Sequence, residues 1–207
     1  MLDMLENDQV ILLWQTFIEG NRSSFQQLME VNYKPLFTYG TKFSSDTELI
    51  KDCIQDLFLN LWNKRETIST HVNVKAYLFS SLRRLLHRKV ESNARNKALE
   101  GFNDTSSFSF EVSVEQQLIT EESTAKIAKK IASSLEKLPA RQKEIIYLKY
   151  FHNFSRDEIA QAMDIVPQTV SNLLQLALKK LRDDFTPNFD PNILFFILPL
   201  IVKETIF

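Results

Sequence analysis

Glycine, proline and cysteine are all scarce in this chain of 207 residues, which contains three Gly, six Pro and one Cys. Loops that cradle phosphates need several glycines at fixed spacing, so a nucleotide-binding loop of that kind is excluded. A single cysteine, Cys53, cannot form an internal disulfide, which fits a reducing cytoplasm. Because Cys53 lies beside the apolar face of its expected helix, we expect a buried structural thiol rather than a nucleophile.

An excess of charge of either sign is also missing, since the net charge is −1 and the sequence pI is about 6.3. A uniformly basic nucleic-acid coat protein is therefore excluded, and any DNA contact must use a local patch. The spacing of His71, His87 and His152 is not that of metal ligands, so we predict no metal, no cofactor and no enzyme activity. The N-terminal stretch MLDMLENDQ is acidic where a signal peptide would be basic, which predicts a cytoplasmic protein.

The apolar run ILFFILPLIV, at 193–202, is only ten residues long. A helix needs about 20 apolar residues to cross a bilayer, so we predict no stable membrane insertion. Pro199 is expected to interrupt a helix in this run. We predict that the tail packs against a domain or a partner, with residence at a membrane surface as the alternative.

Helical periodicity dominates the rest of the chain, which predicts an all-α protein of two small helical domains joined by a flexible acidic linker. Between Lys75 and Lys97 there are seven Lys or Arg and one acid, whereas residues 98–125 contain six acids and no Lys or Arg. A cationic helix followed by an acidic segment indicates two modules with a linker between them. The expected parts are 1–98, a linker at 99–113, a helix-turn-helix domain at 114–185 and a tail at 186–207.

Three amphipathic helices are predicted in the first module, at 5–19, at 24–42, and from a capping box of Ser45 and Glu48 onward. Their core candidates are Leu13, Phe17, Phe25, Leu28, Leu36, Phe37, Ile50, Ile54, Leu57, Phe58 and Leu61. The outer face of the third helix combines polar side chains with one large apolar one: Asp52, Gln55, Asp56, Leu59 and Asn63. One exposed Leu needs no explanation, but a mixed patch of this kind indicates a protein partner.

A basic helix is predicted after Val72, with an apolar side of Leu78, Leu82, Leu85 and Leu86. Aromatic and cationic residues accompany this side: Tyr77, Phe79, Arg83, Arg84, Arg88 and Lys89. Aromatic rings beside cations can hold unpaired DNA, because bases stack on the rings and the cations neutralise phosphates. For Tyr77 and Phe79 the residue type alone favours the core, whereas we interpret the cations as a nucleic-acid contact.

Residues 155–182 predict a helix, a three-residue turn and a second helix. Ser155 and Glu158 form a capping box, the turn occupies 164–166, and Pro167 suits the first position of the second helix. The apolar positions of the two helices follow a helical period: Ile159, Ala160, Met163, Val170, Leu174, Ala177, Leu178 and Leu181.

The opposite face of this second helix is the candidate reading surface, made of Gln168, Thr169, Asn172, Gln175, Leu176 and Lys179. Amides can hydrogen-bond base edges in the major groove, with adenine as the usual partner. Lys179, Lys180 and Arg182 can then contact phosphates. The alternative is a solvated helix face; the cap, the turn length and the amide stripe together favour a DNA-reading helix-turn-helix.

Taken in order, these segments resemble the sigma-70 family of bacterial RNA polymerase sigma factors, in its two-domain, extracytoplasmic-function type. Residues 52–66 resemble the polymerase-binding helix, with Gln55, Phe58 and Trp62 at the best-matched positions. Residues 74–84 resemble the segment that opens and reads the minus-ten element, and 135–182 resemble the domain that reads the minus-thirty-five element. The resemblance implies an initiation factor that binds core polymerase, directs it to promoters and helps to melt the DNA.

The resemblance also implies partners for each surface. Asp52, Gln55 and Asp56 should contact the clamp of the polymerase β′ subunit, and the segment from Tyr77 to Arg88 should meet promoter DNA with one base flipped out. The acidic linker should thread the positively lined channel of the polymerase. Proteins of this type are commonly held by an anti-sigma factor, and no small-molecule substrate is expected.

Three positions depart from the family pattern. Arg84 stands where many relatives carry an Asn near the flipped base, and it can stack or contact phosphate instead. Leu173 and Leu176 replace residues that are frequently basic or polar; Leu173 can join the edge of the core, and Leu176 can meet a thymine methyl. Fewer cations predict weaker, less salt-sensitive DNA binding by the isolated C-terminal domain.

A freestanding helix-turn-helix regulator is the alternative function. Such a protein would bind an operator without polymerase, and residues 52–63 would have no role in it.

Overall fold

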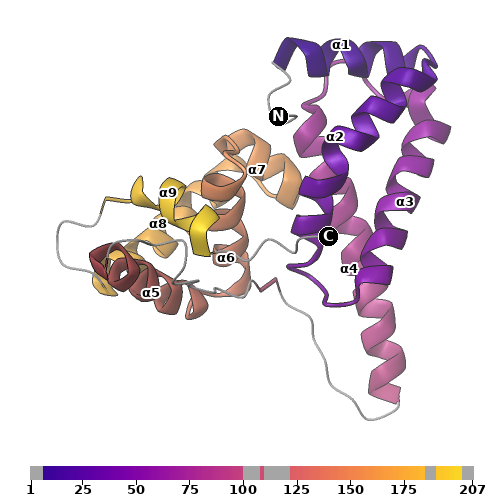
Figure 1. Ribbon diagram of the computed structural model, residues 1–207. Helices are drawn as coiled ribbons and strands as arrows, with labels where there is room; N and C mark the ends of the chain where they lie inside the picture. The colour runs from indigo at the N-terminus through magenta and orange to yellow at the C-terminus, as the bar shows by residue number, and fades with distance from the viewer. Residues whose placement is uncertain (1–6, 100–107, 110–121, 185–189, 202–207) are drawn as a thin grey trace. The chain divides into compact units, whose positions relative to one another are not determined.

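The computed structural model describes residues 7–99, 108–109, 122–184 and 190–201, and these residues form helices and no β-strand (Figure 1). They belong to two units, Met1–Ser106 and Ser107–Phe207. The all-α prediction is confirmed. The division between the units falls inside the predicted linker, most of which lies outside the described residues, and the domain boundaries stay predictions.

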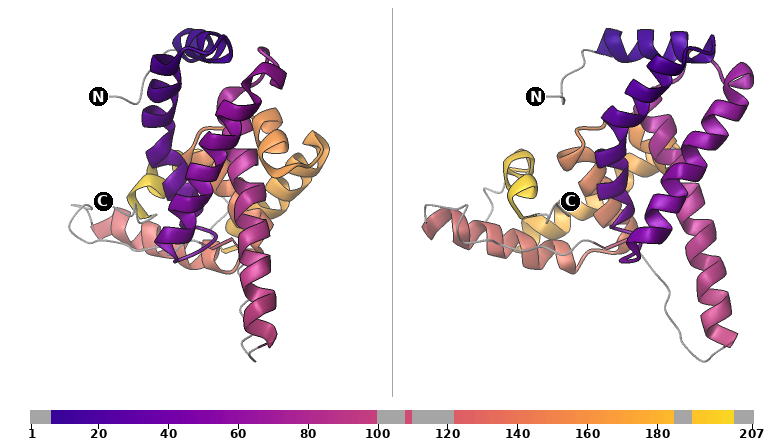
Figure 2. Two further views of the ribbon diagram at one scale, coloured as in Figure 1. Left: turned by 90° about the vertical axis from the view of Figure 1, so that its right-hand side faces the viewer. Right: turned by 45° about the vertical axis from the view of Figure 1, so that its right-hand side comes forward.

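The N-terminal unit contains α1 (Asn7–Ile18), α2 (Arg22–Gly40), α3 (Thr47–Lys64), the 3-10 turn η1 (Arg65–Thr67) and α4 (Val74–Leu99). Helices α2, α3 and α4 pack against one another, and α1 lies across one end of them (Figure 1). The last turns of α4 continue beyond the start of α3 (Figure 2). Four helices therefore enclose one core and leave the outer face of α3 and the far end of α4 open.

Most of the predicted core of this unit is confirmed. The residues that are buried as predicted are Phe17, Leu28, Leu36, Phe37, Ile50, Ile54, Leu57, Phe58, Leu61, Leu78, Leu82 and Leu86. Leu13, Phe25 and Leu85 are half-buried at its edge. Trp14 adds the largest buried side chain, and its indole N–H donates to the carbonyl of Ser69 at 3.2 Å.

The start of α3 differs from the prediction. The cap is Asp46, whose carboxylate accepts from the backbone N–H groups of Glu48 and Leu49, each at 3.1 Å. The predicted capping box of Ser45 and Glu48 is therefore wrong. The Asp46 carboxylate satisfies two of the free N–H groups at the helix start, and it carries the negative charge that the helix dipole favours there.

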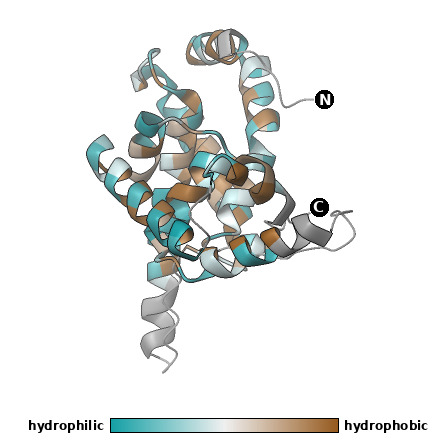
Figure 3. Ribbon diagram, turned by 90° about the vertical axis from the view of Figure 1, so that its left-hand side faces the viewer, coloured by the Kyte–Doolittle hydropathy of each residue, from teal (hydrophilic) through white to brown (hydrophobic). Residues whose placement is uncertain are grey.

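The C-terminal unit contains α5 (Glu122–Glu136), α6 (Ala140–Ile146), the π-helical segment η2 (Tyr147–Phe151), α7 (Arg156–Met163), α8 (Pro167–Asp184) and α9 (Ile193–Ile201). Helix α8 packs on α5, α6 and α7, so it is the central helix of the unit. Hydrophilic and hydrophobic residues alternate along these helices, as amphipathic helices around a core require (Figure 3). Between α5 and α8, the Ser134 hydroxyl donates to the Asp184 carboxylate at 2.6 Å, which holds the pKa of Asp184 below its ordinary value.

An aromatic cluster gathers around η2, which the sequence did not predict. The ring of Tyr147 stacks on Phe151, with centroids 4.8 Å apart, and the ring of Phe108 lies 5.8 Å from it. Phe108 is buried, so this part of the predicted linker is attached to the C-terminal unit. A π-helical turn adds a residue to the helical repeat and thereby turns successive rings to new directions.

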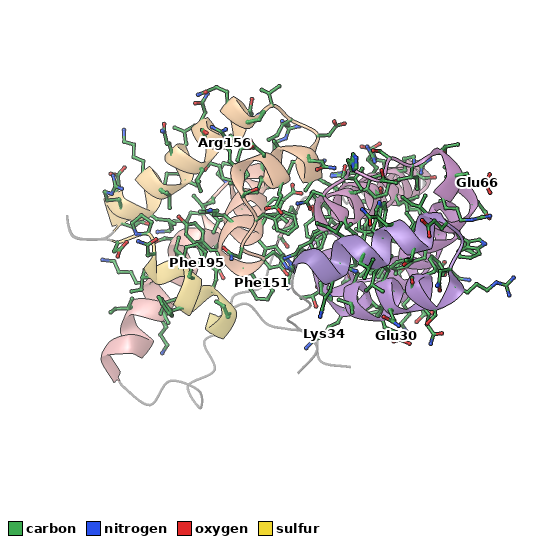
Figure 4. The ribbon with its side chains drawn as sticks, turned by 90° about the horizontal axis from the view of Figure 1, so that it is seen from above. Glu30, Lys34, Glu66, Phe151, Arg156 and Phe195 are labelled. Carbon is green, nitrogen blue, oxygen red and sulfur yellow. The ribbon has the colours of Figure 1, made fainter. Side chains whose placement is uncertain are left out.

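The tail packs on this cluster, as predicted. Phe195 of α9 meets Tyr150 at 4.7 Å between ring centroids, and Phe195 and Phe151 lie on the same side of the unit, away from Arg156 (Figure 4). The predicted interruption at Pro199 is wrong, because α9 continues to Ile201 and loses only the backbone hydrogen bond that a proline cannot donate. No helix in the part of the chain that the structure describes combines the length and the apolar character needed to span a bilayer.

Candidate protein and nucleic-acid interfaces

The outer face of α3 presents the predicted mixed patch to solvent. Asp52, Gln55 and Asn63 are exposed, and Leu59 between them is 54% exposed. Asp56 is half-buried. The opposite face of the same helix is fully packed, so α3 is held rigidly while its outer stripe stays accessible. We call Asp52, Gln55, Asp56, Leu59 and Asn63 the α3 stripe.

Asp56 is tied to the basic helix α4. Lys89 Nζ lies 3.0 Å from Asp56 Oδ2. The hydrogen bond to Asp56 raises the pKa of Lys89, although partial burial opposes the shift. The carboxylate at this position of the α3 stripe is thus partly neutralised within the chain, and Asp52 supplies the stripe's less compensated negative charge.

Cys53 lies behind the α3 stripe and is fully buried, which confirms the expected buried thiol. Burial raises the pKa of the Cys53 thiol, because the protein interior disfavours the thiolate. A protonated, inaccessible thiol is a poor nucleophile, so Cys53 serves packing between α3 and its neighbours.

On helix α4 the predicted cationic residues are more exposed to solvent than the predicted aromatic residues. Arg84 and Arg88 are exposed and Arg83 is half-buried, so the cations reach solvent. Tyr77 is half-buried, with its ring 5.7 Å from that of Trp14.

Phe79 requires a correction. It is fully buried, with its ring 4.8 Å from that of Tyr39. It follows the same helical spacing as Leu82 and Leu86, which places it on the core side of α4. Phe79 therefore presents no surface on which a base could stack, and its predicted DNA contact is wrong.

The helix-turn-helix forms as the sequence predicts. Ser155 Oγ accepts from the backbone N–H of Glu158 at 3.3 Å, while the Glu158 carboxylate accepts from the Ser155 N–H at 2.6 Å. Asp164 ends α7 in the left-handed region with φ of 56°, and Ile165 N–H then donates to the Ala160 carbonyl at 3.0 Å. These bonds fix the angle at which α8 leaves the turn.

The outward face of α8 carries the predicted reading residues. Those that are exposed are Gln168, Asn172, Gln175, Leu176, Lys179 and Lys180; Thr169 is half-buried. Val170, Ala177 and Leu181 are buried, but Leu174 and Leu178 are only half-buried, because they flank the packed stripe rather than face it. Gln168 Nε2 donates to Asn172 Oδ1 at 3.0 Å, so the first two amides are joined.

Val166 is a surface residue that the sequence prediction assigned only to the turn. It is 63% exposed, and its carbonyl accepts the first hydrogen bonds of α8, from Thr169 and Val170. The sequence could have predicted this position of Val166, because it directly precedes Pro167. A residue before proline is held extended, and proline often occupies the first position of a helix. Elsewhere in the described ranges, no group of three His, Cys, Asp or Glu residues is placed to hold a metal ion.

Two family models match the chain, one over each unit. The model described as Sigma-70 region 2 matches residues 28–96, and the model described as Sigma-70, region 4 matches residues 128–181. The first match contains all of α3, and the second contains α7 and all of α8 except its last three residues. Helices α1 and α9 lie outside both.

Known proteins agree with these matches. The ECF RNA polymerase sigma factor SigL of Mycobacterium tuberculosis is 28% identical over 148 residues, which cover 71% of this chain and 80% of SigL. CnrH, solved with the cytosolic domain of CnrY, matches with a TM-score of 0.55 and 20% identity over 84% of this chain and 94% of that chain. RpoE, solved with the anti-sigma factor NepR from Bartonella quintana, matches with a TM-score of 0.58 and 21% identity over 78% and 96%. The two structural likenesses show a shared fold.

Proposed function

Since the chain belongs to the sigma-70 family of RNA polymerase sigma factors, in its ECF group, we propose which of its surfaces carry the tasks of transcription initiation. The protein is a polymerase-binding transcription factor; it directs the polymerase to promoters and catalyses no reaction of its own. Its work on RNA polymerase implies a cytoplasmic location.

The α3 stripe binds the clamp of the polymerase β′ subunit. Leu59 carries this proposal, because a large apolar side chain that is 54% exposed within a polar stripe suits a contact that becomes buried in a complex. Gln55 and Asn63 can hydrogen-bond at the rim, and Asp52 can meet a cation. If the protein were a freestanding helix-turn-helix regulator, the α3 stripe would have no role in its function.

Helix α4 contacts the DNA that is being melted at the minus-ten element. Arg84 and Arg88 are exposed and can neutralise phosphates, and the half-buried Arg83 can reach one from the edge of the helix. Tyr77 is the remaining aromatic candidate on this helix, since its ring is half-buried rather than enclosed. Stacking of a base on Tyr77 would stabilise the open strand.

Helix α8 reads the minus-thirty-five element. The amides of Gln168, Asn172 and Gln175 provide donors and acceptors for base edges, and Lys179 and Lys180 follow them toward the end of the helix, where phosphates lie. Thr169 and Leu176 flank the amides. The order of polar readers first and cations last agrees with the way a recognition helix enters the major groove by its N-terminal residues.

An anti-sigma factor is a further partner that the structural likenesses support. CnrH and RpoE were each solved as complexes, RpoE with the anti-sigma factor NepR. We propose that an anti-sigma factor likewise binds this chain when it is not bound to RNA polymerase. The acidic linker, part of a stretch with six acids at 98–125, is proposed to follow the positively lined channel of the polymerase.

Two measurements test the function and separate it from the alternative. Run-off transcription with core polymerase on a genomic library should give discrete products that require this chain. An electrophoretic shift on the promoters recovered should require core polymerase as well. Operator-specific binding by the chain alone, at nanomolar strength and physiological salt, would favour the freestanding regulator and overturn the proposal.

A further inference from the structure

Two amides on the first turns of α8 are already bound to each other. Gln168 Nε2 donates to Asn172 Oδ1 at 3.0 Å, and both side chains are exposed. This bond favours the orientation in which Asn172 Oδ1 faces Gln168 and leaves Nδ2 for a second partner. A carbonyl oxygen has two lone pairs, so Asn172 Oδ1 can accept from adenine N6 while Nδ2 donates to N7. Asn172 is then the base reader, and Gln168 is its positioning residue.

Leu176 continues the same row of α8, four residues after Asn172, and is 51% exposed. Four residues advance about 6 Å along a helix axis, which is roughly two base steps of about 3.4 Å each. An aliphatic side chain in the major groove finds its best contact at the C5 methyl group of thymine. Leu176 is thus placed to meet a thymine about two base steps from the adenine that Asn172 reads.

The side chains that recognise guanine are missing from this part of the chain. Arg and Lys are the usual partners of guanine O6 and N7. Between Arg156 and Lys179 there is no Lys or Arg. Lys179 and Lys180 come late on α8, where a recognition helix meets phosphates rather than bases.

We propose that α8 selects an A·T-specific upstream element, in which Asn172 reads an adenine and Leu176 reads the methyl group of a thymine about two base steps away. This proposal rests on the assignment of α8 to the minus-thirty-five element and adds the chemistry of the DNA that it takes. It also gives the two amides different roles: Asn172 contacts the base, and Gln168 positions Asn172.

Base analogues in the promoter test each contact separately. The polymerase is reconstituted with the full chain, and synthetic promoters carry either 7-deazaadenine, which lacks N7, or deoxyuridine, which lacks the thymine methyl group. One 7-deazaadenine should lower initiation by about tenfold with the unaltered chain and should have no effect with Asn172→Ala. One deoxyuridine about two steps away should lower initiation about threefold with the unaltered chain and not with Leu176→Ala.

Gln168→Glu tests the positioning role. An ionised carboxylate cannot donate to Asn172 Oδ1 but accepts from Nδ2, so it should turn the Asn172 amide and abolish the distinction between adenine and 7-deazaadenine. Helix content should stay unchanged, because Gln and Glu have similar helix propensities. Gln15→Ala is the matched control, since Gln15 is exposed on α1 outside both matched regions; it should keep both analogue effects.

The possible outcomes distinguish failure of the A·T reading from failure of the proposed function in transcription initiation. Analogue effects that are equal in the unaltered chain and in the Asn172 and Leu176 variants would overturn the A·T reading alone. Asn172→Ala should alter base selection at one promoter position. If the unaltered chain requires a guanine at that position, the A·T reading is also overturned. If no template supports transcription that depends on both the chain and core polymerase, the proposed function fails, and this proposal fails with it.

Discussion

Lys89 on α4 holds the carboxylate of Asp56 on α3, with Nζ 3.0 Å from Oδ2. The pair joins the helix proposed to bind polymerase to the helix proposed to meet melted DNA. Both side chains are more than a third exposed, so the pair contributes about 0–1 kcal/mol to the free energy of unfolding. Its larger effect is to fix the position of Asp56 within the α3 stripe.

The pH dependence of stability should report this pair. The pKa of Lys89 is raised, so its stabilisation is fully present below the pKa of an unfolded Lys and is lost as pH rises through the folded value. Urea unfolding of Lys89→Met should show a smaller loss of stability between neutral and strongly alkaline pH than the unaltered chain. Lys64→Met, at the exposed end of α3, is the control. The same alkaline slope in Lys89→Met and the unaltered chain would refute the role of the pair.

Gly40 at the end of α2 has no room for a side chain. A Cβ there would lie 2.6 Å from Cγ2 of Ile50, which is fully buried. Gly40→Ala should therefore lower the free energy of unfolding by about 1–3 kcal/mol, measured by denaturant unfolding. Adding Ile50→Leu, which removes Cγ2, should recover part of the loss. Gln27→Ala, exposed on α2, should cost little; a Gly40→Ala variant as stable as this control would contradict the close packing of α2 and α3.

The Cys53 thiol should react slowly in the folded protein. Burial raises its pKa, so at pH values near the ordinary pKa of a thiol, about 8.5, a smaller fraction of the native thiol than of the unfolded thiol is ionised. A chromogenic disulfide reagent should label Cys53 at a rate that follows opening of the fold and rises sharply in denaturant. Because the unfolded thiol ionises first, stability should also fall as pH rises above the unfolded pKa. Labelling at the rate of a small thiol would show that Cys53 is accessible.

Asp164 should be replaceable by glycine with a gain in stability. Its φ of 56° lies in the left-handed region, which costs a residue with a side chain more than it costs glycine. Asp164→Gly should raise the free energy of unfolding of the C-terminal unit by up to about 1 kcal/mol, because relief of the left-handed strain, about 1–2 kcal/mol, exceeds the extra chain entropy of glycine, about 0.5–1 kcal/mol. Asp164→Val should lower it, because a β-branched residue strongly avoids this region. A loss of stability in Asp164→Gly would mean that the carboxylate itself supports the turn.

The helices and their buried faces were predictable because local rules and tertiary packing agree there. The capping box at Ser155 and the turn before Pro167 depend on neighbouring residues, and both were predicted correctly. The start of α3 was missed by a single position because Ser45 and Asp46 compete for the same cap. The sequence offers both, with similar preferences for the cap position, and in the structure Asp46 occupies it.

Other features depend on tertiary contacts that local sequence patterns do not predict. Phe79 fits both a core and a stacking platform by residue type; its helical spacing from Leu82 and Leu86 indicates the core side, and its contact with Tyr39 confirms it. The π-helical segment and Phe108 come together because rings far apart in the chain pack around Tyr147. Pro199 remains in a helix since burial of Leu194, Ile197 and Leu198 outweighs one missing hydrogen bond.

Equilibrium binding to core RNA polymerase tests the central claim most directly, because every other task follows from it. Gln55→Lys combined with Leu59→Lys changes the α3 stripe without touching the Asp56–Lys89 pair, and both side chains are exposed, so the fold should remain intact by circular dichroism. We predict that this variant binds core polymerase about a hundredfold more weakly than the unaltered chain, while Gln27→Lys binds normally. Equal affinity of the double variant and the unaltered chain would contradict the account.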